Sequence, residues 1–564
     1  MAVPEKVLDL VRNFDSNINK YKKGSNEEEV KIWFINPLFE ALGWDVGNKS
    51  NKSPDQTDVR FEDTIKSGKR PDYSFWLNGE RKFFVDAKDP SVNIEGGINP
   101  AFQVKTYAWS SNMPLVIVTD FEEFAVYDCN AEPNKNDKPQ KSRLKIIKYY
   151  EYEKRWEEIA SLFSKDSVQN GSLESVPKTK GKKVDEALLE DISDWRKSLA
   201  KNIARMNPSL NQKELNHAVQ MTIDRILFLR ICEDRSIEDD ERLKMLLKGE
   251  NVYQRLFALF EEADKKYNSG LFHFHAEDNR NDSDTITPSL IMDDKILKDI
   301  IRGLYYPDSP YVFSEIPTEI LGQVYEQFLG KVIQLDENEN RKVEVVEKTE
   351  ARKAGGIYYT PSYIVDYIVK NTLGKLLEGK TPKEASELRI LDPACGSGSF
   401  LIGAYQYLLD WHFYWYNKNL IPLLNAGYKP TSKEVQELLP GPIEKPDKNA
   451  KAKSKKIWER ALVAAIPTEQ RADGLHLRTF ERKRILLNNI YGVDIDTQAV
   501  EVTKLSLLLK VLEGENKATI ADLTKYSKER ALPDLGNNIK CGNSLIEQDF
   551  FEIHFDMKLD ELDQ

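Results

Sequence analysis

Residues 388–409 join a short apolar strand to a helix through a glycine-rich turn, and this order limits what the surrounding chain can fold into. The segment reads LRILDPACGSGSFLIGAYQYLL. Asp392 ends the strand, and Gly396 and Gly398 let the backbone turn tightly and approach a ligand. The first turn of the helix offers free N–H groups. We therefore expect an α/β sheet with a ligand site at the end of this strand.

A second strand followed by a helix lies at residues 484–509, RILLNNIYGVDIDTQAVEVTKLSLLL. Asp494 ends this strand, and an acid at the end of the second strand commonly binds ribose hydroxyls. Ile495 beside it would pack on an adenine face. The glycine-rich turn alone suits either a dinucleotide or S-adenosylmethionine. Its spacing is not GxGxxG, which disfavours a dinucleotide.

Four segments in order resemble motifs of the gamma class of amino-methyltransferases, which includes N6-adenine DNA methyltransferases. KAGGIYYTPS resembles motif X, DPACGSGSF motif I, GVDID motif II and NNIKCGNSLI motif III. The resemblance implies a Rossmann-like, doubly wound α/β domain that binds S-adenosylmethionine. The cofactor-binding residues that it implies are Thr360, Pro361, Asp392, Pro393, Ala394, Gly396, Gly398, Phe400, Asp494, Ile495 and Asn543.

Motif IV of that class, (N/D)PP(Y/F), does not occur in this sequence. Its polar side chain and aromatic ring hold the flipped target base. We therefore expect this chain alone to bind the cofactor without transferring its methyl group. We interpret the chain as an N-terminal piece, a natural truncation or one half of a split system. In a split system, a second chain would carry motif IV and the target-recognition domain.

Residues 374–381, GKLLEGKT, fit the P-loop pattern GxxxxGK[ST]. A working P-loop follows a strand and opens a helix. This segment instead follows a predicted helix and is followed directly by Pro382. We interpret Gly379 as the end of that helix and discount ATP binding.

The N-terminal part contains a predicted hairpin at residues 70–88, RPDYSFWLNGERKFFVDAK. Asp86 and Lys88 share one face of their strand, because side chains alternate along it. Carboxylates hold Mg²⁺, which lowers the pKa of a bound water, and a lysine can position that water. The pattern therefore suits phosphodiester hydrolysis. An isolated match is more often an exposed hairpin with solvated charges.

The register of this hairpin is itself a prediction. A two-residue turn at Asn78-Gly79 would pair Asp72 with Val85 and send Asp72 and Asp86 to opposite faces. Shared metal binding requires one face. We therefore predict a three-residue loop or a β-bulge.

Five elements together resemble the PD-(D/E)xK nuclease domain of Type I restriction subunits and fused Type II restriction-modification enzymes. They are a helical Glu27, the stretch Phe34 to Asp45, Pro71-Asp72, Asp86-Ala87-Lys88, and Gln103 with Tyr107. The resemblance implies a Mg²⁺ site at Asp72, Asp86 and Ala87, with Lys88 orienting the water. Glu27 would assist from its helix, although Glu28 and Glu29 are its neighbours. Gln103 and Tyr107 would support the site or touch the DNA backbone.

The chain has 564 residues, which suggests several domains. We expect a PD-(D/E)xK nuclease domain at 1–163, a linker at 164–184, a helical connector at 185–350 and the methyltransferase domain at 351–564. Helical periodicity in the connector extends to IPTEILGQVYEQFLGKVI. Its Arg225, Arg230 and Arg235 alternate with acids, which favours a salt-bridged core face over a DNA-binding stripe.

Composition excludes several classes. No apolar run approaches a membrane span and the N-terminus lacks a signal peptide, so we expect a cytoplasmic protein without membrane partners. The four cysteines form no CxxC pair, so neither a disulfide framework nor a zinc ribbon is indicated. The net charge of −11 argues against a surface coated for non-specific nucleic-acid binding, but not against a local basic groove.

These observations predict a Type IIG/IIL restriction-modification enzyme truncated within its methyltransferase domain. Its nuclease would cut double-stranded DNA with Mg²⁺, and its second domain would serve adenine-N6 methylation with S-adenosylmethionine. Two alternatives remain. One is a remnant or split subunit that binds S-adenosylmethionine and DNA without chemistry, and the other is a repair nuclease with a vestigial cofactor fold.

Overall fold

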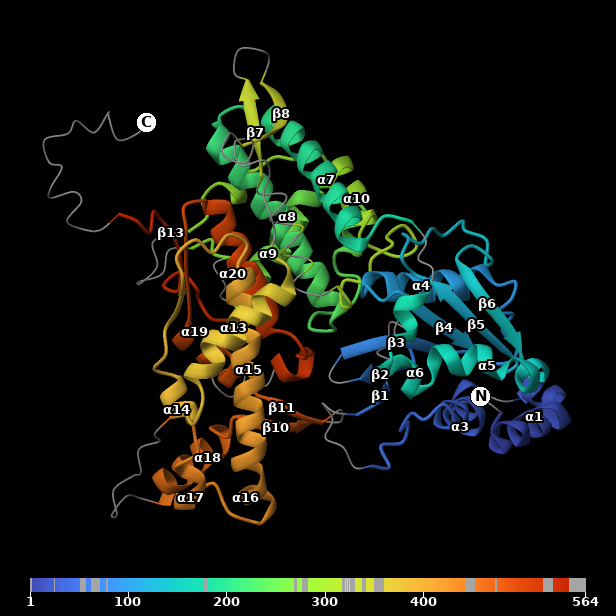
Figure 1. Cartoon of the computed structure of the whole chain (residues 1–564). Helices are drawn as coiled ribbons and strands as arrows, with labels where there is room; N and C mark the ends of the chain where they lie inside the picture. Colours follow the sequence, from blue (N-terminus) through green and yellow to red (C-terminus); the bar gives the residue numbers. More distant parts are fainter. Residues whose placement is uncertain are drawn as a thin grey trace, which may run out of the picture. The chain divides into compact units, whose positions relative to one another are not determined.

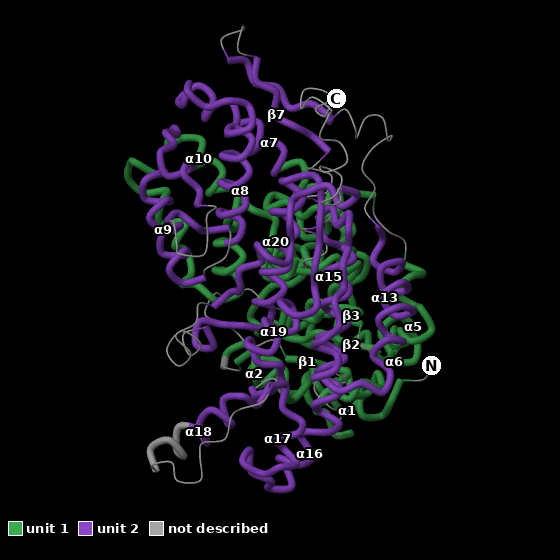
Figure 2. The backbone as a smooth tube through the Cα atoms, turned by 90° about the vertical axis from the view of Figure 1, so that its left-hand side faces the viewer, with its two compact units in different colours: residues 1–191, 229–252, 294–317 green, residues 192–228, 253–293, 318–564 purple. Residues whose placement is uncertain are grey.

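The computed structural model of the chain divides into two compact units (Figure 2). Unit 1 comprises residues 1–191, 229–252 and 294–317, and unit 2 comprises residues 192–228, 253–293 and 318–564. The residues that the structure describes are 3–24, 26–50, 57–61, 71–77, 80–176, 180–267, 271–275, 283–316, 320, 322, 324, 330–336, 341–348, 360–441, 452–471, 474–520 and 531–546.

Unit 1 is built on a six-stranded sheet (Figure 1). In sheet order, its strands are β1 (Val59–Phe61), β2 (Tyr73–Leu77), β3 (Glu80–Ala87), β4 (Leu115–Thr119), β5 (Glu123–Asp128) and β6 (Arg143–Lys148). Strands β3 and β4 are parallel, and every other neighbouring pair is antiparallel. The parallel pair is connected through helix α4 (Ile98–Ser110), as a parallel crossover requires.

Helices cover both faces of this sheet, which explains the unbroken apolar sequence of its central strands. In β4, Leu115 and Ile117 pack with α1 (Glu5–Gly24), α3 (Asn36–Ala41) and α5 (Tyr152–Phe163). Val116 and Val118 point to the opposite face, where they pack with α4. Alternate side chains therefore enter two separate cores, and a strand buried on both sides does not alternate in polarity.

The first part of the predicted linker is folded. Residues 164–184 begin with α6 (Lys165–Gln169) and a 3₁₀ turn at Ser172–Ser175. Val168 and Leu173 are buried in the core that contains α5. Both side chains give this polar stretch enough apolar contact to dock.

Two of the arginines that the sequence singles out in the connector, Arg225 and Arg230, are buried. The main helices of the segment are α7 (Val184–Met206), α8 (Gln212–Asp234), α9 (Val252–Tyr267) and α10 (Asp294–Arg302). Within unit 2, buried Arg225 pairs with Asp284 at 2.7 Å. Within unit 1, buried Arg230 pairs with Asp234 at 2.7 Å. The predicted salt-bridged core face is confirmed for these two residues.

The end of the connector corrects one prediction. Lys331–Ile333 are not helical as predicted. They belong to β7 (Lys331–Asp336), which pairs with β8 (Lys342–Glu347) in an antiparallel hairpin. Val332 lies opposite Val346 and Ile333 opposite Val345. β-Branched pairs of this kind favour strands, and they override the helical periodicity of the preceding residues.

The remainder of unit 2 contains a three-stranded parallel sheet in the order β13–β12–β9. These strands are β9 (Ile390–Asp392), β12 (Ile490–Asp494) and β13 (Ile539–Cys541). Helices α13 (Ser362–Leu376), α15 (Ser399–Asn419), α19 (Thr479–Asn489) and α20 (Thr497–Val511) pack around them. Gly492 lies opposite Asp392, and Asp494 opposite Cys541, so the strand ends that carry the predicted ligand residues lie at one edge.

The P-loop pattern has no P-loop geometry. Gly374 lies inside α13, and Gly379 adopts a left-handed φ of 73° in the turn that follows the helix.

Unit 2 also contains the shorter helices α14 (Pro382–Ala385), α16 (Ile421–Asn425), α17 (Lys433–Gln436) and α18 (Ala452–Ala464), and a hairpin of β10 (Thr468–Arg471) with β11 (Gly474–Leu477). Over the described part of the chain, no helix has the length and apolarity to cross a membrane.

Candidate active sites

The hairpin of β2 and β3 brings Asp72 and Asp86 together. Tyr73 pairs with Val85 and Phe75 with Phe83, whereas Leu77 pairs with Glu80. The register therefore shifts between Phe75 and Trp76, which is the β-bulge that the sequence predicted. Since Tyr73 lies opposite Val85, Asp72 comes opposite Asp86. The turn residues Asn78 and Gly79 lie outside the described residues.

Asp72 is held at this position by two contacts. One carboxylate oxygen accepts the N–H of Ala87 at 2.7 Å. The other forms an ion pair with Lys31. The Asp72 side chain is 11% exposed and that of Lys31 is 12% exposed, so both charges are largely removed from water. Such burial is tolerable only because each charge has a partner.

Lys31 is the member of the site that the sequence analysis missed. Its ammonium also pairs with Glu27 at 3.1 Å and Glu28 at 2.8 Å. These carboxylates hold the pKa of Lys31 above its usual range although burial opposes the rise. Lys31 opens a five-residue π-helical turn, Lys31–Ile35, that follows helix α2 (Glu27–Val30). Turns of this kind are frequent at functional sites.

Asp86 is the most buried charge of the site, with 2% of its side chain exposed. Burial raises the pKa of its carboxyl to about 7, the Lys88 ammonium opposes the rise, and the Asp72 and Glu27 carboxylates add to it. Lys88 pairs directly with Asp86, and this contact keeps the pKa of Lys88 raised against the effect of burial. Three carboxylates therefore act on one another, and two lysines compensate them.

The structure distinguishes the three acids at the start of α2. Glu29 completes a capping box with Asn26, whose side chain accepts the Glu29 N–H at 2.9 Å. The side chain of Glu28 is 72% exposed, and that of Glu27 is 39% exposed. Of the three, Glu27 contributes to the raised pKa of Asp86. The role of Glu27 at the nuclease site stays a prediction.

Gln103 and Tyr107 lie on α4, which packs against β3, β4 and β5. Gln103 is partly buried and Tyr107 is 1% exposed. Their role at the nuclease site stays a prediction.

The donor set suits a hard divalent cation. Two carboxylates meet beside the backbone of Ala87, and Lys31 supplies positive charge between Asp72 and Glu27. Oxygen donors of this kind are the ligands of Mg²⁺. Among the described residues, no group of three or more His, Cys, Asp or Glu side chains has metal-binding geometry. The fit therefore rests on two carboxylates, a backbone carbonyl and water, which is common for Mg²⁺.

At the second site, backbone contacts shape the glycine-rich turn. The Gly396 N–H donates to the Asp494 carboxylate at 2.8 Å, and the Cys395 N–H donates to the Val493 carbonyl at 2.9 Å. Gly396 and Gly398 have φ values of 54° and 86°, which only glycine adopts readily. A Cβ at Gly398 would lie 2.8 Å from Thr503 Cγ2. The Thr503 hydroxyl in turn donates to the Gly396 carbonyl at 2.8 Å.

The predicted cofactor residues around this turn lie at the carboxyl ends of the strands. Burial raises the pKa of Asp392, and the nearby Asp494 adds to the shift. Asp494 also accepts the Asp496 N–H at 2.9 Å, so each of its oxygens keeps acceptor capacity for a ribose hydroxyl. Ile495 beside it is 74% exposed.

The other predicted residues are less constrained. Thr360 and Pro361 precede α13, and Phe400 lies in the first turn of α15. Asn543 follows β13 and is exposed. The remaining motif X residues, 353–359, lie outside the described residues. Two strand-end carboxylates, a glycine turn without side chains and an exposed apolar residue fit S-adenosylmethionine.

Sequence comparison with known families finds two matches. Residues 371–558 match the family "MmeI, DNA-methyltransferase domain", and residues 317–419 match the family "N-6 DNA Methylase". Both matches fall in unit 2 except for residue 317, and the first includes β9, β12 and β13.

Two curated proteins are similar over almost the whole chain. The type II restriction enzyme and methyltransferase RM.Eco57I of Escherichia coli is 33% identical over 97% of this chain and 51% of its own length. The putative type II restriction enzyme and methyltransferase RM.MjaORFECS2P of Methanocaldococcus jannaschii is 24% identical over 94% of this chain and 41% of its own length. The chain thus spans about half the length of these relatives.

Two solved structures align with low scores. A cryo-EM structure of a DrdV–DNA complex has a TM-score of 0.29 and 12% identity, covering 90% of this chain and 38% of that chain. The type IIG restriction endonuclease BpuSI has a TM-score of 0.25 and 11% identity, covering 86% and 41%. The predicted resemblance to fused restriction-modification enzymes is confirmed by the sequence matches.

Proposed function

We propose that this chain, which is similar in sequence to type II restriction enzymes fused to methyltransferases, is a Mg²⁺-dependent endonuclease on double-stranded DNA joined to a cofactor-binding domain for adenine-N6 methylation. The observation that supports the nuclease most is the bulged hairpin that puts Asp72 opposite Asp86, with Lys88 beside them. The observation that supports the second activity most is the match of residues 317–419 to the N-6 DNA methylase family.

In the nuclease, Asp72, Asp86 and the Ala87 carbonyl would hold Mg²⁺ at the scissile phosphate. The ion would polarise the phosphate and lower the pKa of the attacking water. Lys88 would orient that water and stabilise the negative charge that develops on the phosphate oxygens. Glu27 would add an acceptor from α2. Lys31 supplies positive charge to Asp72 and Glu27 until the cation and the DNA arrive.

In the second domain, Asp494 would accept hydrogen bonds from the ribose hydroxyls and Ile495 would pack on the adenine ring. The glycine-rich turn would lie against the methionine part of the cofactor, because Gly396 and Gly398 present no side chain there. S-Adenosylmethionine supplies the methyl group. No residue of this chain is assigned to the target adenine.

One experiment tests both activities. Purified chain is incubated with a mixture of double-stranded DNAs, with Mg²⁺ or with EDTA, and with or without S-adenosylmethionine labelled in its methyl group. We expect Mg²⁺-dependent fragments and cofactor retention by the protein. Calorimetry measures cofactor binding separately.

Matched variants make the result specific. Lys88→Ala should remove cleavage, whereas Lys141→Ala should not, because Lys141 is an exposed partner of Asp137 at 2.7 Å. Cleavage that survives in EDTA or in Lys88→Ala would contradict the nuclease. Cutting without any cofactor binding by the folded protein would favour a repair nuclease with a vestigial fold.

A further inference from the structure

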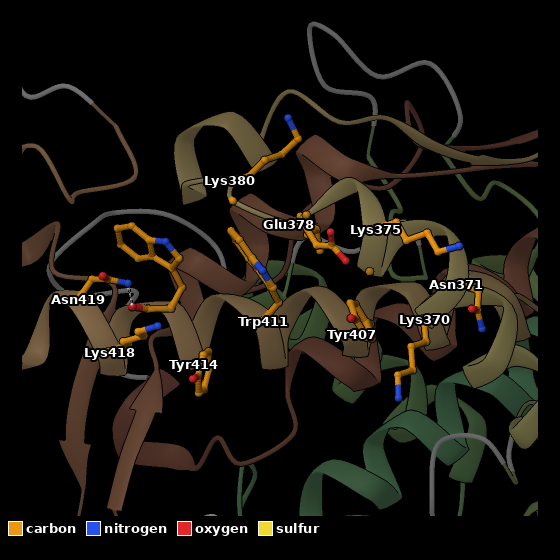
Figure 3. A pocket seen from close by; sticks show the side chains of 14 residues that line it. Lys370, Asn371, Lys375, Glu378, Lys380, Tyr407, Trp411, Tyr414, Lys418 and Asn419 are labelled. Atoms are coloured by element: carbon orange, nitrogen blue, oxygen red, sulfur yellow. Dashed lines mark hydrogen bonds between the residues drawn. The ribbon is translucent and has the colours of Figure 1, made fainter.

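A groove of about 660 Å³ lies between α13 with its following turn and α15 in unit 2 (Figure 3). Residues 370–380 form one wall and residues 407–419 form the other. Its volume lies within the range of roughly 300–1,000 Å³ that small-molecule sites occupy. None of its lining residues belongs to the predicted cofactor site or to the nuclease site.

Close packing of the two helices fixes this groove. A Cβ at Gly403 would lie 2.5 Å from Val365 Cγ1, and a Cβ at Gly374 would lie 2.7 Å from the Tyr407 hydroxyl. The first contact joins an earlier residue of α13 to an earlier residue of α15, and the second joins a later residue of each helix, so α13 and α15 run parallel. Their carboxyl-terminal ends therefore lie beside each other at the groove.

Positive charge gathers on its rim. The lining lysines are Lys370, Lys375, Lys380 and Lys418. Among the described residues that line the groove, Glu378 is the one acid, although the chain as a whole carries a net charge of −11. Over the described ranges, none of the four lysines makes an ion pair, whereas Lys433 and Lys504 elsewhere in unit 2 do.

Helix ends explain part of this charge but not all of it. Lys375 and Lys418 lie in the last turns of α13 and α15, where a cation interacts favourably with the helix dipole. Lys370 and Lys380 lie outside those last turns. The helix ends therefore account for two of the four lysines around the groove, and the other two need another explanation.

Aromatic rings occupy the wall between the lysines. They are Tyr407, Trp411, Tyr414 and Trp415, all on α15. Figure 3 shows the Trp411 side chain standing between α15 and the turn that carries Glu378. The side chain of Tyr414 is 65% exposed. Ring faces and cations are therefore presented together.

We propose that this groove binds single-stranded nucleic acid, with phosphates on the lysines and bases on the rings of Tyr414 and Trp411. Lysines that track a backbone and aromatic side chains that stack bases are the two components of such sites. A duplex would use the lysines alone, because its bases are stacked on one another. The groove is independent of both proposed activities, so their failure would leave this inference standing.

Binding is measured by fluorescence anisotropy with a labelled thymidine 12-mer, in EDTA so that the nuclease is silent. Tyr414→Ala should lose more affinity for the 12-mer than for a 12-base-pair duplex, because a duplex offers the ring no free base. The double variant Lys375→Ala/Lys418→Ala should bind roughly tenfold more weakly and should lower the slope of log affinity against log salt by about 1.4, which is two phosphate contacts at about 0.7 each. The charge-matched control is Lys342→Ala/Lys433→Ala, since both lysines are exposed and pair with acids.

The rings are tested separately. Tyr414→Ala should weaken 12-mer binding by roughly tenfold, within the range for loss of one stacked base, and Tyr414→Phe should keep it. Tyr428→Ala, at a residue that is 45% exposed outside the groove, is the control. Thermal unfolding confirms that each variant is folded.

The proposal would be overturned by any of the following: parent-like affinity in both groove variants, no binding by the folded parent, a loss confined to the duplex, or an equal loss of heparin binding in Tyr414→Ala. Competition by thymidine monophosphate as strong as by the 12-mer would also overturn it, in favour of a mononucleotide site.

Discussion

The two candidate sites hold their key groups by different means. In unit 1, charged side chains from three separate segments compensate one another: Asp86 is 2% exposed and Lys31 12% exposed, and each pairs with an opposite charge. In unit 2, backbone N–H groups and two glycines shape the cofactor turn, and Ile495 stays 74% exposed. The first site is organised by charge and the second by the path of the backbone.

This difference decides what each site tolerates. Removing one charge from the unit 1 site leaves its buried partners uncompensated, which is costly. Removing one charge from the unit 2 site leaves the turn in place, because Gly396 and Gly398 hold their conformation through other contacts as well. Adding a methyl group should instead be costly in the unit 2 turn, because a Cβ at Gly398 would collide with Thr503.

The largest effect is expected from Lys88→Ala, which should lower the cleavage rate at least about a thousandfold, or roughly 4 kcal/mol of transition-state stabilisation. Lys88 pairs with the buried Asp86, so its loss removes both the positive charge and the partner of that carboxylate. Cleavage of double-stranded DNA with Mg²⁺ is the measurement. S-Adenosylmethionine binding should be unchanged, and a parallel loss of that binding would mean that the variant acts through misfolding.

The next effect tests the backbone-organised site with two glycines of nearly equal φ. Gly398→Ala should destabilise unit 2 by roughly 3 kcal/mol and weaken cofactor binding, because φ is 86° and the new Cβ would meet Thr503 at 2.8 Å. Gly427→Ala has a φ of 87° with nothing within 4 Å, so it should cost only about 1 kcal/mol.

Thermal unfolding and calorimetry with S-adenosylmethionine compare these two variants. Equal destabilisation would show that backbone strain alone, and not the contact with Thr503, determines the cost. The description of the turn as closely packed would then be wrong.

The same contrast governs what could be predicted from the sequence. The unit 2 turn is local: strand, glycines and helix are adjacent. The positions of Asp392, Gly396 and Gly398 at a strand end and its turn could therefore be predicted from their own neighbours, and that of Asp494 from a second local pattern. The β-bulge between β2 and β3 was also predictable, because shared metal binding requires Asp72 and Asp86 on one face.

Lys31 could not be identified in that way. Its only sequence signal is its spacing from Glu27 and Glu28, four and three residues away, and such pairs occur on many solvated helices. Its role depends on its ion pair with Asp72, a contact between segments that are distant in the sequence. The hairpin of β7 and β8 was missed for a related reason. Strand β7 begins directly after Gly330, at the end of a segment with helical periodicity, and only its pairing with β8 shows that it is a strand.

Lys31→Ala measures how far charge organises the unit 1 site. Without divalent cations, the variant should lose roughly 2 kcal/mol of stability, because Asp72 and Glu27 lose their shared cation. Ca²⁺ should raise its melting temperature more than that of the parent, since a bound cation replaces the missing charge. The control is Lys6→Ala, whose lysine is 54% exposed and pairs with Glu40 at 2.7 Å. An equal response to Ca²⁺ in parent and variant would contradict a shared cation position.

The smallest effect on cleavage is expected at Glu233, and it tests whether a carboxyl with a raised pKa must belong to a functional site. Glu233 in unit 1 is a second carboxyl whose pKa burial raises to about 7, while its hydrogen bonds with the Tyr305 hydroxyl and the Leu243 N–H oppose the shift. It lies outside the cluster of Asp72 and Asp86, so a carboxyl pKa near 7 does not by itself mark a site in this unit.

Glu233 predicts a pH dependence of stability with a definite sign. Its pKa is higher in the folded state than the usual 4.5, so the folded state binds the proton more tightly, and the stabilisation is complete below about pH 4.5 and is lost as pH rises through about 7. In Glu233→Gln, which stays neutral, this loss disappears. The stability of the variant relative to the parent should therefore rise by roughly 2–3 kcal/mol between pH 5 and pH 8. Thermal unfolding across that range measures the difference, and cleavage by the variant should match the parent. A stability difference that is flat with pH would show that Glu233 is ionised throughout, and a loss of cleavage would mean that the charge-organised region of unit 1 extends beyond α2 and the hairpin of β2 and β3.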